Sequence, residues 1–220
     1  MNKIIPGDKI EITVDMKDFK INTDLVISLI KDNKLITCGH CLPENAILSF
    51  GKIIYTSGFD NPNEKYEIGI IKIFDKMKQS FSNKIHNKVL NLNKKKLELN
   101  TKIFNYCNRK KIFGRIISIN KNNLNGWHFH HAITKLTKPY YLVVGLKSTI
   151  DEELSDSIKK NFKINSKNKF VYKLTTSGYS GSPWIYESNG KLYHIGIHIG
   201  KTTGSFNGKL YEIAYVKPLI

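Results

Sequence analysis

The chain has 220 residues, and its apolar content of 40% is enough to bury a core, which excludes a wholly disordered chain. Its formal net charge is +17, and the positive charge is nearly all Lys, since Arg occurs only at Arg109 and Arg115. Dedicated nucleic-acid surfaces favour Arg for bidentate contacts, so the charge argues against such a surface as the main function. A basic RNA-binding module is kept as an alternative.

Cysteine usage and hydropathy indicate the compartment. Three cysteines, an odd and small number, do not form the disulfide framework of a secreted protein. Residues 1–12 contain Pro6, Asp8 and Glu11 and no apolar run of signal-peptide length, and the longest apolar runs elsewhere are too short to cross a bilayer. We therefore expect a soluble, intracellular and cytoplasmic protein without membrane contact, with a viral source as a further option.

Short strands dominate the predicted elements. Ile10, Ile12 and Val14 alternate with polar residues in the first of them, 9–14. Further strands are predicted at 25–30, 34–37, 46–50, 52–56, 68–74, 101–106, 115–119, 140–146, 170–175, 184–186, 193–199 and 211–216. Gly, Asn, Asp and Pro separate these segments, and many short strands at this spacing predict an all-β barrel or sandwich.

Helical signal is scarce. The segment 149–162 is the better candidate because its acidic residues come early and its lysines late, and 77–90 is a weaker one. The polar stretch 91–100 contains a Lys triplet and is the candidate linker between two β halves. The predicted domains are therefore 1–92 and 93–220.

The sharpest motif is the stretch 177–183, Ser-Gly-Tyr-Ser-Gly-Ser-Pro. Gly178 and Gly181 allow a tight turn that exposes the hydroxyl of Ser180 and aims backbone N–H groups at one point, as an oxyanion hole requires. Alone, such a stretch is equally typical of a polar hairpin turn.

Two upstream residues supply what a serine nucleophile lacks. His40 follows an apolar strand, and Glu67 opens the apolar stretch Glu-Ile-Gly-Ile-Ile-Lys. A serine hydroxyl reacts only with a base beside it, and the base needs a group to orient it. The chain order is therefore base, acid, nucleophile.

These three motifs in this order resemble the chymotrypsin-like serine peptidases, over the chain from about residue 24 to its end. The resemblance implies two antiparallel six-stranded β-barrels with few short helices, His40 and Glu67 on the first and Ser180 on the second. It also implies roles: Ser180 attacks, His40 is the general base, Glu67 orients it, and the N–H groups of Gly178 and Ser180 form the oxyanion hole. The family's usual acid is Asp, so Asp60 and Asp75 remain alternatives to Glu67.

The stretch 196–200, Gly-Ile-His-Ile-Gly, resembles the pocket motif of bacterial glutamyl endopeptidases and of viral polyprotein-processing proteases. This resemblance implies that His198 and Thr175 bind the substrate side chain before the cut, while Ile199 and Gly200 contact the polypeptide as it pairs with Ile199–Lys201. An imidazole and a hydroxyl donate hydrogen bonds to a carboxylate or an amide oxygen, so we expect cleavage after Glu or Gln, with Asp as a further option.

The stretch 38–41, Cys-Gly-His-Cys, supports two competing hypotheses. It is also the active-site motif of thiol-disulfide oxidoreductases, although no helical pattern follows it here. Its thiols with Cys107 or a histidine are candidate zinc ligands, but the usual second ligand pair is missing. We therefore expect no metal and no cofactor, and the oligomeric state stays open.

Overall fold

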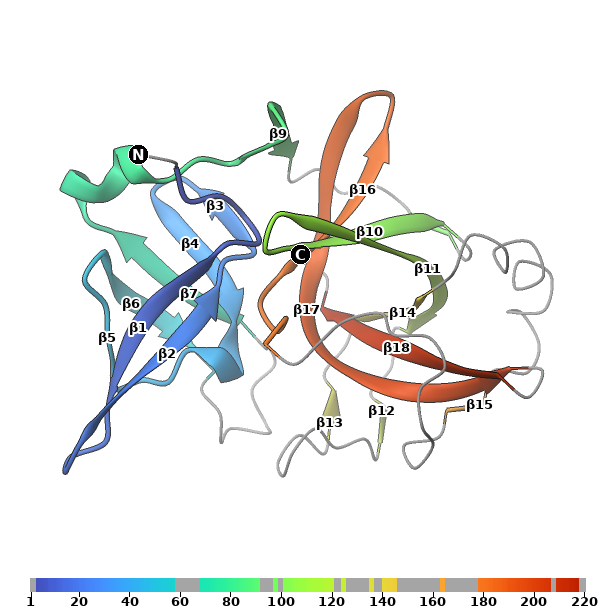
Figure 1. Cartoon of the computed structure of the whole chain (residues 1–220), viewed down its shortest axis with the longest axis horizontal. Coiled ribbons are helices and arrows are strands. Elements are labelled where there is room, and N and C mark those ends of the chain that lie inside the picture. The colour runs from blue at the N-terminus through green and yellow to red at the C-terminus, as the bar shows by residue number, and fades with distance from the viewer. Residues whose placement is uncertain are drawn as a thin grey trace.

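A computed structural model describes residues 3–57, 68–91, 97–98, 101–120, 124–125, 135–136, 140–145, 163–164, 178–206 and 209–217, with the surroundings of side chains for part of these. Strands make up most of this part of the chain (Figure 1). No helix within these ranges is long and apolar enough to cross a membrane.

The N-terminal strands form two small sheets that enclose one core. The three-stranded sheet has the order β2-β1-β5, and the four-stranded sheet has the order β3-β4-β7-β6. Their bounds are β1 Lys9–Asp15, β2 Lys20–Val26, β3 Leu29–Lys31, β4 Lys34–Cys38, β5 Ala46–Ile47, β6 Gly51–Thr56 and β7 Ile68–Ile73. Ile12, Leu25, Leu35 and Ile71 are at most 2% exposed and meet between these sheets, so the alternation expected for β1 is confirmed.

The later strands form one larger sheet that returns on itself. β16 pairs with both β10 and β17, and this joins the two ends of the order β16-β10-β11-β14-β18-β17. The bounds are β10 Lys102–Cys107, β11 Lys110–Asn120, β14 Tyr140–Gly145, β16 Pro183–Ser188, β17 Lys191–Phe206 and β18 Lys209–Lys217. The short strands β12 (Leu124–Asn125), β13 (Lys135–Leu136) and β15 (Lys163–Ile164) complete this part. The all-β prediction is confirmed, while the arrangement as two six-stranded barrels stays a prediction.

The segment between the two groups is not the helix expected for 77–90. A 3₁₀ helix, η2 (Asp75–Ser80), is followed by a hairpin of β8 (Lys84–Ile85) and β9 (Lys88–Asn91). β9 pairs in parallel with β17, so the chain reaches the larger sheet by Lys88. The domain boundary at 92–93 therefore stays a prediction, and the helix predicted at 149–162 lies outside the described residues.

Among the described residues, four hairpins close through two-residue turns in which both residues have positive φ. Such turns have the twist that antiparallel strands require, and Asn, Asp and Gly adopt them most readily. They are Asp32–Asn33, His86–Asn87, Asn108–Arg109 and Asn189–Gly190. The turn at 86–87 explains the wrong helix, because two successive positive φ angles end any helical continuation.

A buried hydrogen bond joins the two groups of strands. Ser28 Oγ lies 2.9 Å from Nε2 of His194, which stands on β17. Around it, Leu29 from the first group packs with Phe104 and Ile185 from the second. Complete burial lowers the pKa of His194 from 6.5 to about 3, so this imidazole is neutral in the folded protein.

His194 makes the stability of the protein depend on pH. The unfolded chain protonates this imidazole below about pH 6.5, whereas the folded protein does so only near pH 3. Between these values the unfolded state binds more protons, so the free energy of unfolding falls by about 1.4 kcal/mol per pH unit as pH decreases. Urea unfolding at a series of pH values measures this slope. The His194→Gln variant loses it, and His86→Gln, an exposed position, is the matched control; an unchanged slope in His194→Gln would contradict the assignment.

Candidate active site

His40 stands in a short turn at the end of a buried strand. β4 is an inner strand of its sheet, and Thr37 and Cys38 at its end are fully buried. The 3₁₀ turn η1 (Gly39–Cys41) follows at once and leaves His40 half-buried. Position 39 has little room for a side chain, because a Cβ there would lie 1.7 Å from Ser57 Oγ and 3.0 Å from the carbonyl oxygen of Ile68.

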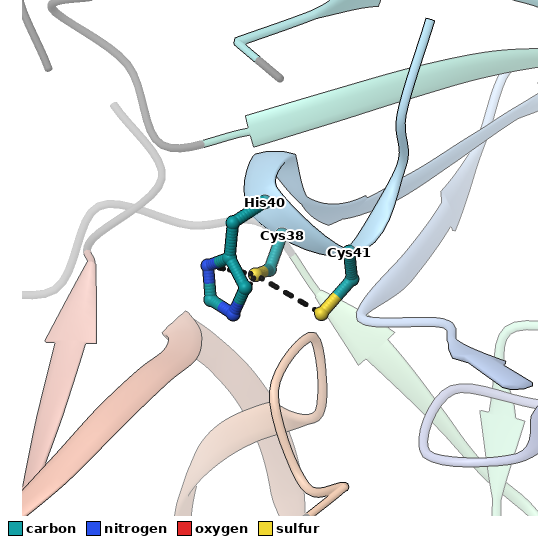
Figure 2. A group of neighbouring side chains, drawn as sticks. All are labelled: Cys38, His40 and Cys41. Carbon is teal, nitrogen blue, oxygen red and sulfur yellow. Dashed lines mark hydrogen bonds between the residues drawn. The ribbon is translucent and has the colours of Figure 1, made fainter. Parts of the chain in front are cut away.

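Two thiols lie near the imidazole of His40, that of Cys38 next to the ring and that of Cys41 beyond it (Figure 2). Cys38 Sγ lies 3.0 Å from Nδ1 and 3.4 Å from Nε2 of His40, and these similar distances place the sulfur over the face of the ring. The Sγ atoms of Cys38 and Cys41 are 3.6 Å apart. The three residues offer ligand atoms within 4.8 Å of one another, an arrangement that can hold a metal ion.

The loop that carries Ser180 is fixed by backbone hydrogen bonds. Gly178 and Gly181 have φ of +84° and +93°, which confirms that this tight turn needs glycine. Gly181 N–H donates to the carbonyl of His198 at 2.8 Å, and Ser182 N–H donates to the carbonyl of Tyr179 at 2.9 Å. These two N–H groups are already hydrogen-bonded within the protein, so they are not available to an oxyanion. The predicted oxyanion donors are two other residues of the loop, Gly178 and Ser180.

The same loop packs against the strands that carry His40. A Cβ on Gly181 would lie 2.6 Å from the carbonyl oxygen of Val26 and 2.8 Å from Thr37 Oγ1. Cys41 Sγ is 3.9 Å from the carbonyl oxygen of Ser180. The structure therefore brings the nucleophile loop to the turn of His40, although 139 residues separate Cys41 from Ser180.

The imidazole predicted to line the substrate pocket has one tautomer fixed by its neighbour. His198 is 2% exposed, and its Nδ1 lies 3.3 Å from Nε1 of the buried Trp184. The indole N–H can only donate, so Nδ1 of His198 accepts. The proton of the neutral ring is then on Nε2, which makes that atom a hydrogen-bond donor.

The strand predicted to receive the substrate, β17, pairs with β18 along one edge and with β16 and β15 along the other. Gly200 pairs with Tyr215 of β18, and a register shift separates it from His198. On the other edge, β16 pairs with β17 as far as Ile197, and β15 pairs with it from Gly204. Between these points no described strand pairs with β17, and His198 bonds the nucleophile loop instead: its N–H donates to the carbonyl of Ser182 and its carbonyl accepts from Gly181 N–H. Pairing of a substrate with Ile199–Lys201 therefore stays a prediction.

The third member of the predicted triad and one pocket residue cannot be placed. Glu67, Asp60 and Thr175 lie outside the described residues. Ile68, the chain neighbour of Glu67, pairs with Cys38 two residues before His40. Asp75 follows the opposite end of β7, roughly 16 Å further along at 3.3 Å per residue. It is 92% exposed, and the hydrogen bond and charge of Lys78 lower its pKa, which describes a surface ion pair.

Two residues that support the site were not singled out from the sequence. Trp184 sets the tautomer of His198, and Asn105 donates from Nδ2 to Ser182 Oγ at 2.7 Å, beneath the nucleophile loop. Asn105 could have been recognised from the sequence as a buried polar residue, because it interrupts the otherwise apolar run Ile-Phe-Asn-Tyr-Cys at 103–107. Its complete burial makes its hydrogen bonds part of the support of the loop.

The surroundings of Cys38 and Cys41 differ from those of a thiol-disulfide oxidoreductase. In that class a helix N-terminus lowers the pKa of the first thiol. Here η1 is only three residues long, and the side chain of Cys38 makes no cap hydrogen bond to it. The local structure therefore gives the oxidoreductase hypothesis no support.

Comparison with solved structures defines the fold. The chain is similar to the chymotrypsin of Cellulomonas bogoriensis, with a TM-score of 0.55 and 10% identity over 98% of this chain and 91% of that chain. It is also similar to protease A of Thermobifida fusca, with a TM-score of 0.54 and 13% identity over 98% and 91% of the two chains. No protein-family model and no curated protein sequence matches it. The protein has the chymotrypsin-like fold, as the resemblance implied.

Because Gly181 contacts Val26, we expect an added methyl group to lower the free energy of unfolding more at Gly181 than at Gly190. Gly190 also has positive φ, but a Cβ there meets nothing within 4 Å. Gly190→Ala therefore costs about 1 kcal/mol of backbone strain. Gly181→Ala adds a collision with backbone and costs about 2–4 kcal/mol. Urea unfolding of both variants measures the difference, and equal losses would show that the nucleophile loop does not pack tightly on the first group of strands.

Proposed function

We propose that the protein is a serine endopeptidase with Ser180 as nucleophile, His40 as general base and Glu67 as the orienting acid. The observation that carries this proposal is the contact of the Ser180 loop with the His40 turn, through Cys41 Sγ and the Ser180 carbonyl. The chymotrypsin-like fold of the chain supports it, because the family resemblance places the triad between two groups of strands. Polypeptides are the proposed substrates.

The proposed reaction follows from the chemistry of these groups. Ser180 Oγ forms a bond to the peptide carbonyl carbon while His40 takes the hydroxyl proton. The N–H groups of Gly178 and Ser180 hold the resulting oxyanion. When the C–N bond breaks, His40 gives its proton to the leaving amine, and water then releases the acyl group by the reverse sequence. Glu67 stabilises the imidazolium in both halves of the cycle.

The proposed specificity is for Glu or Gln before the cut, with Asp as a further option. Its support is the donor character of His198 Nε2, which follows from the hydrogen bond of Trp184 to Nδ1. An N–H donor in the pocket favours a substrate side chain with an acceptor oxygen, which Glu and Gln both provide. The hydroxyl of Thr175 is the proposed second donor. The substrate backbone would pair with β17 at Ile199–Lys201.

Replacing the nucleophile tests the reaction class. Ser180→Ala is expected to lower kcat/KM on a peptide library by roughly a thousandfold or more. Ser188→Ala, at the end of β16, is the matched serine control and keeps activity. The double variant Cys38→Ser/Cys41→Ser keeps measurable proteolysis if the nucleophile is Ser180. Proteolysis that survives in Ser180→Ala and disappears in the double variant would instead assign the reaction to a thiol.

Two substitutions test the pocket. His198→Ala is expected to reduce kcat/KM for peptides with Glu or Gln before the cut by about a hundredfold, since the buried donor is lost. Trp184→Phe keeps the imidazole but removes the N–H that fixes its tautomer, so it gives a smaller loss in the same direction. A peptide with Ala at that position is the control, because it separates recognition from damage to the fold. Equal losses on all peptides would refute the role of His198 in specificity.

The RNA-binding alternative stays a prediction from the charge of +17. Steep salt dependence of RNA affinity together with absence of peptidase activity would favour it.

A further inference from the structure

We propose that Cys38, His40 and Cys41 form a binding site for a thiolate-preferring metal ion such as Zn²⁺, and that the bound metal inhibits the peptidase by occupying its base. The inhibitory part rests on the proposed function, in which His40 is that base. The metal-binding part rests on the geometry alone.

Two of the separations between the three side chains are close to the edges of a tetrahedral zinc site, and all the ligand atoms lie within 4.8 Å of one another. Zn–S and Zn–N bonds of about 2.3 and 2.0 Å require S···S and S···N separations of about 3.8 and 3.5 Å. The two sulfurs are 3.6 Å apart, and Cys38 Sγ is 3.0 and 3.4 Å from the two ring nitrogens of His40. The sulfur lies over the ring face, so the imidazole must turn about its Cβ–Cγ bond to point a lone pair at the metal.

The backbone already holds the three side chains close together, so only the imidazole has to turn. All three belong to one turn, so no long loop has to be ordered when metal binds. Thr56 Oγ1 donates to the carbonyl of Leu42 at 2.6 Å and lies 3.2 Å from that of Gly39, which fixes both ends of η1. Cys38 is buried, while His40 and Cys41 are half-buried, and the three side chains lie next to one another (Figure 2). Two sulfurs and one imidazole favour Zn²⁺ over Mg²⁺ or Ca²⁺.

Metal binding and catalysis compete for the same atoms. A protonated thiol releases its proton to solvent when it binds the metal. The nitrogen that coordinates the metal has no lone pair left, and the ring is turned away from its catalytic orientation. It therefore cannot accept the proton of Ser180. Three protein ligands leave the fourth position for water.

Zinc binding is measured first without reference to activity. The full-length Ser180→Ala protein, kept reduced with a phosphine, is titrated with Zn²⁺ against a chromophoric chelator and with Co²⁺ for thiolate-to-metal charge-transfer absorption. We expect one metal per chain. Cys38→Ser and Cys41→Ser, each made in the Ser180→Ala protein, weaken binding by about a hundredfold or more. Cys107→Ser is the matched control, because burial raises the pKa of that thiol to about 11 and keeps it protonated.

Inhibition is measured separately on the protein with Ser180 intact. One equivalent of Zn²⁺ is expected to abolish peptide cleavage, and a chelator to restore it. In Cys41→Ser, half-inhibition relative to its own zinc-free rate requires about a hundredfold more Zn²⁺.

The two measurements distinguish the possible failures. Absence of metal binding in the Ser180→Ala protein overturns the site. Binding that leaves the cleavage rate unchanged overturns the inhibitory role. Binding that depends on Cys38 and Cys41 in a protein that cleaves nothing supports the site and overturns the proposed function instead.

Discussion

The close contact of Gly181 with Val26 and Thr37 is the constraint on which the rest of the site depends. It presses the loop of one group of strands onto the backbone of the other, with less room than one methyl group needs. Ser180 stands next to this contact, and Thr37 belongs to the strand that ends at the turn of His40. A loop held by side chains alone would vary in position, whereas backbone against backbone leaves one arrangement.

Buried polar groups extend this constraint through the interior. Ser28 bonds His194 between the two groups, Asn105 bonds Ser182 beneath the loop, and Trp184 bonds His198 at the predicted pocket. Each of these groups would be costly to bury without its partner, so the partners specify one packing among several apolar alternatives. β17 carries both His194 and His198 and thereby connects the junction between the groups to the pocket.

Local signals accounted for much of what the sequence predicted. The alternation in 9–14 and the glycines around Ser180 depend on near neighbours, and the structure bears both out. The helix predicted at 77–90 was wrong because His86 and Asn87 have positive φ and form the turn of a hairpin. The sequence already made Cys38 and Cys41 candidate zinc ligands, but the orientations of these thiols and of the His40 ring could not be predicted, since they depend on how the turn packs, including Gly39 against Ser57. The pairing of Trp184 with His198 depends on a register shift that no sequence pattern reveals.

The four two-residue turns described above indicate that some parts of the molecule form earlier than others. Hairpins of this kind close in about 1–10 μs, whereas the junction of Ser28 with His194 must bring together residues 166 positions apart. During synthesis the strands around His40 emerge long before Ser180 does. Until Ser180 has been synthesised, the folded N-terminal strands therefore carry the proposed base without its proposed nucleophile.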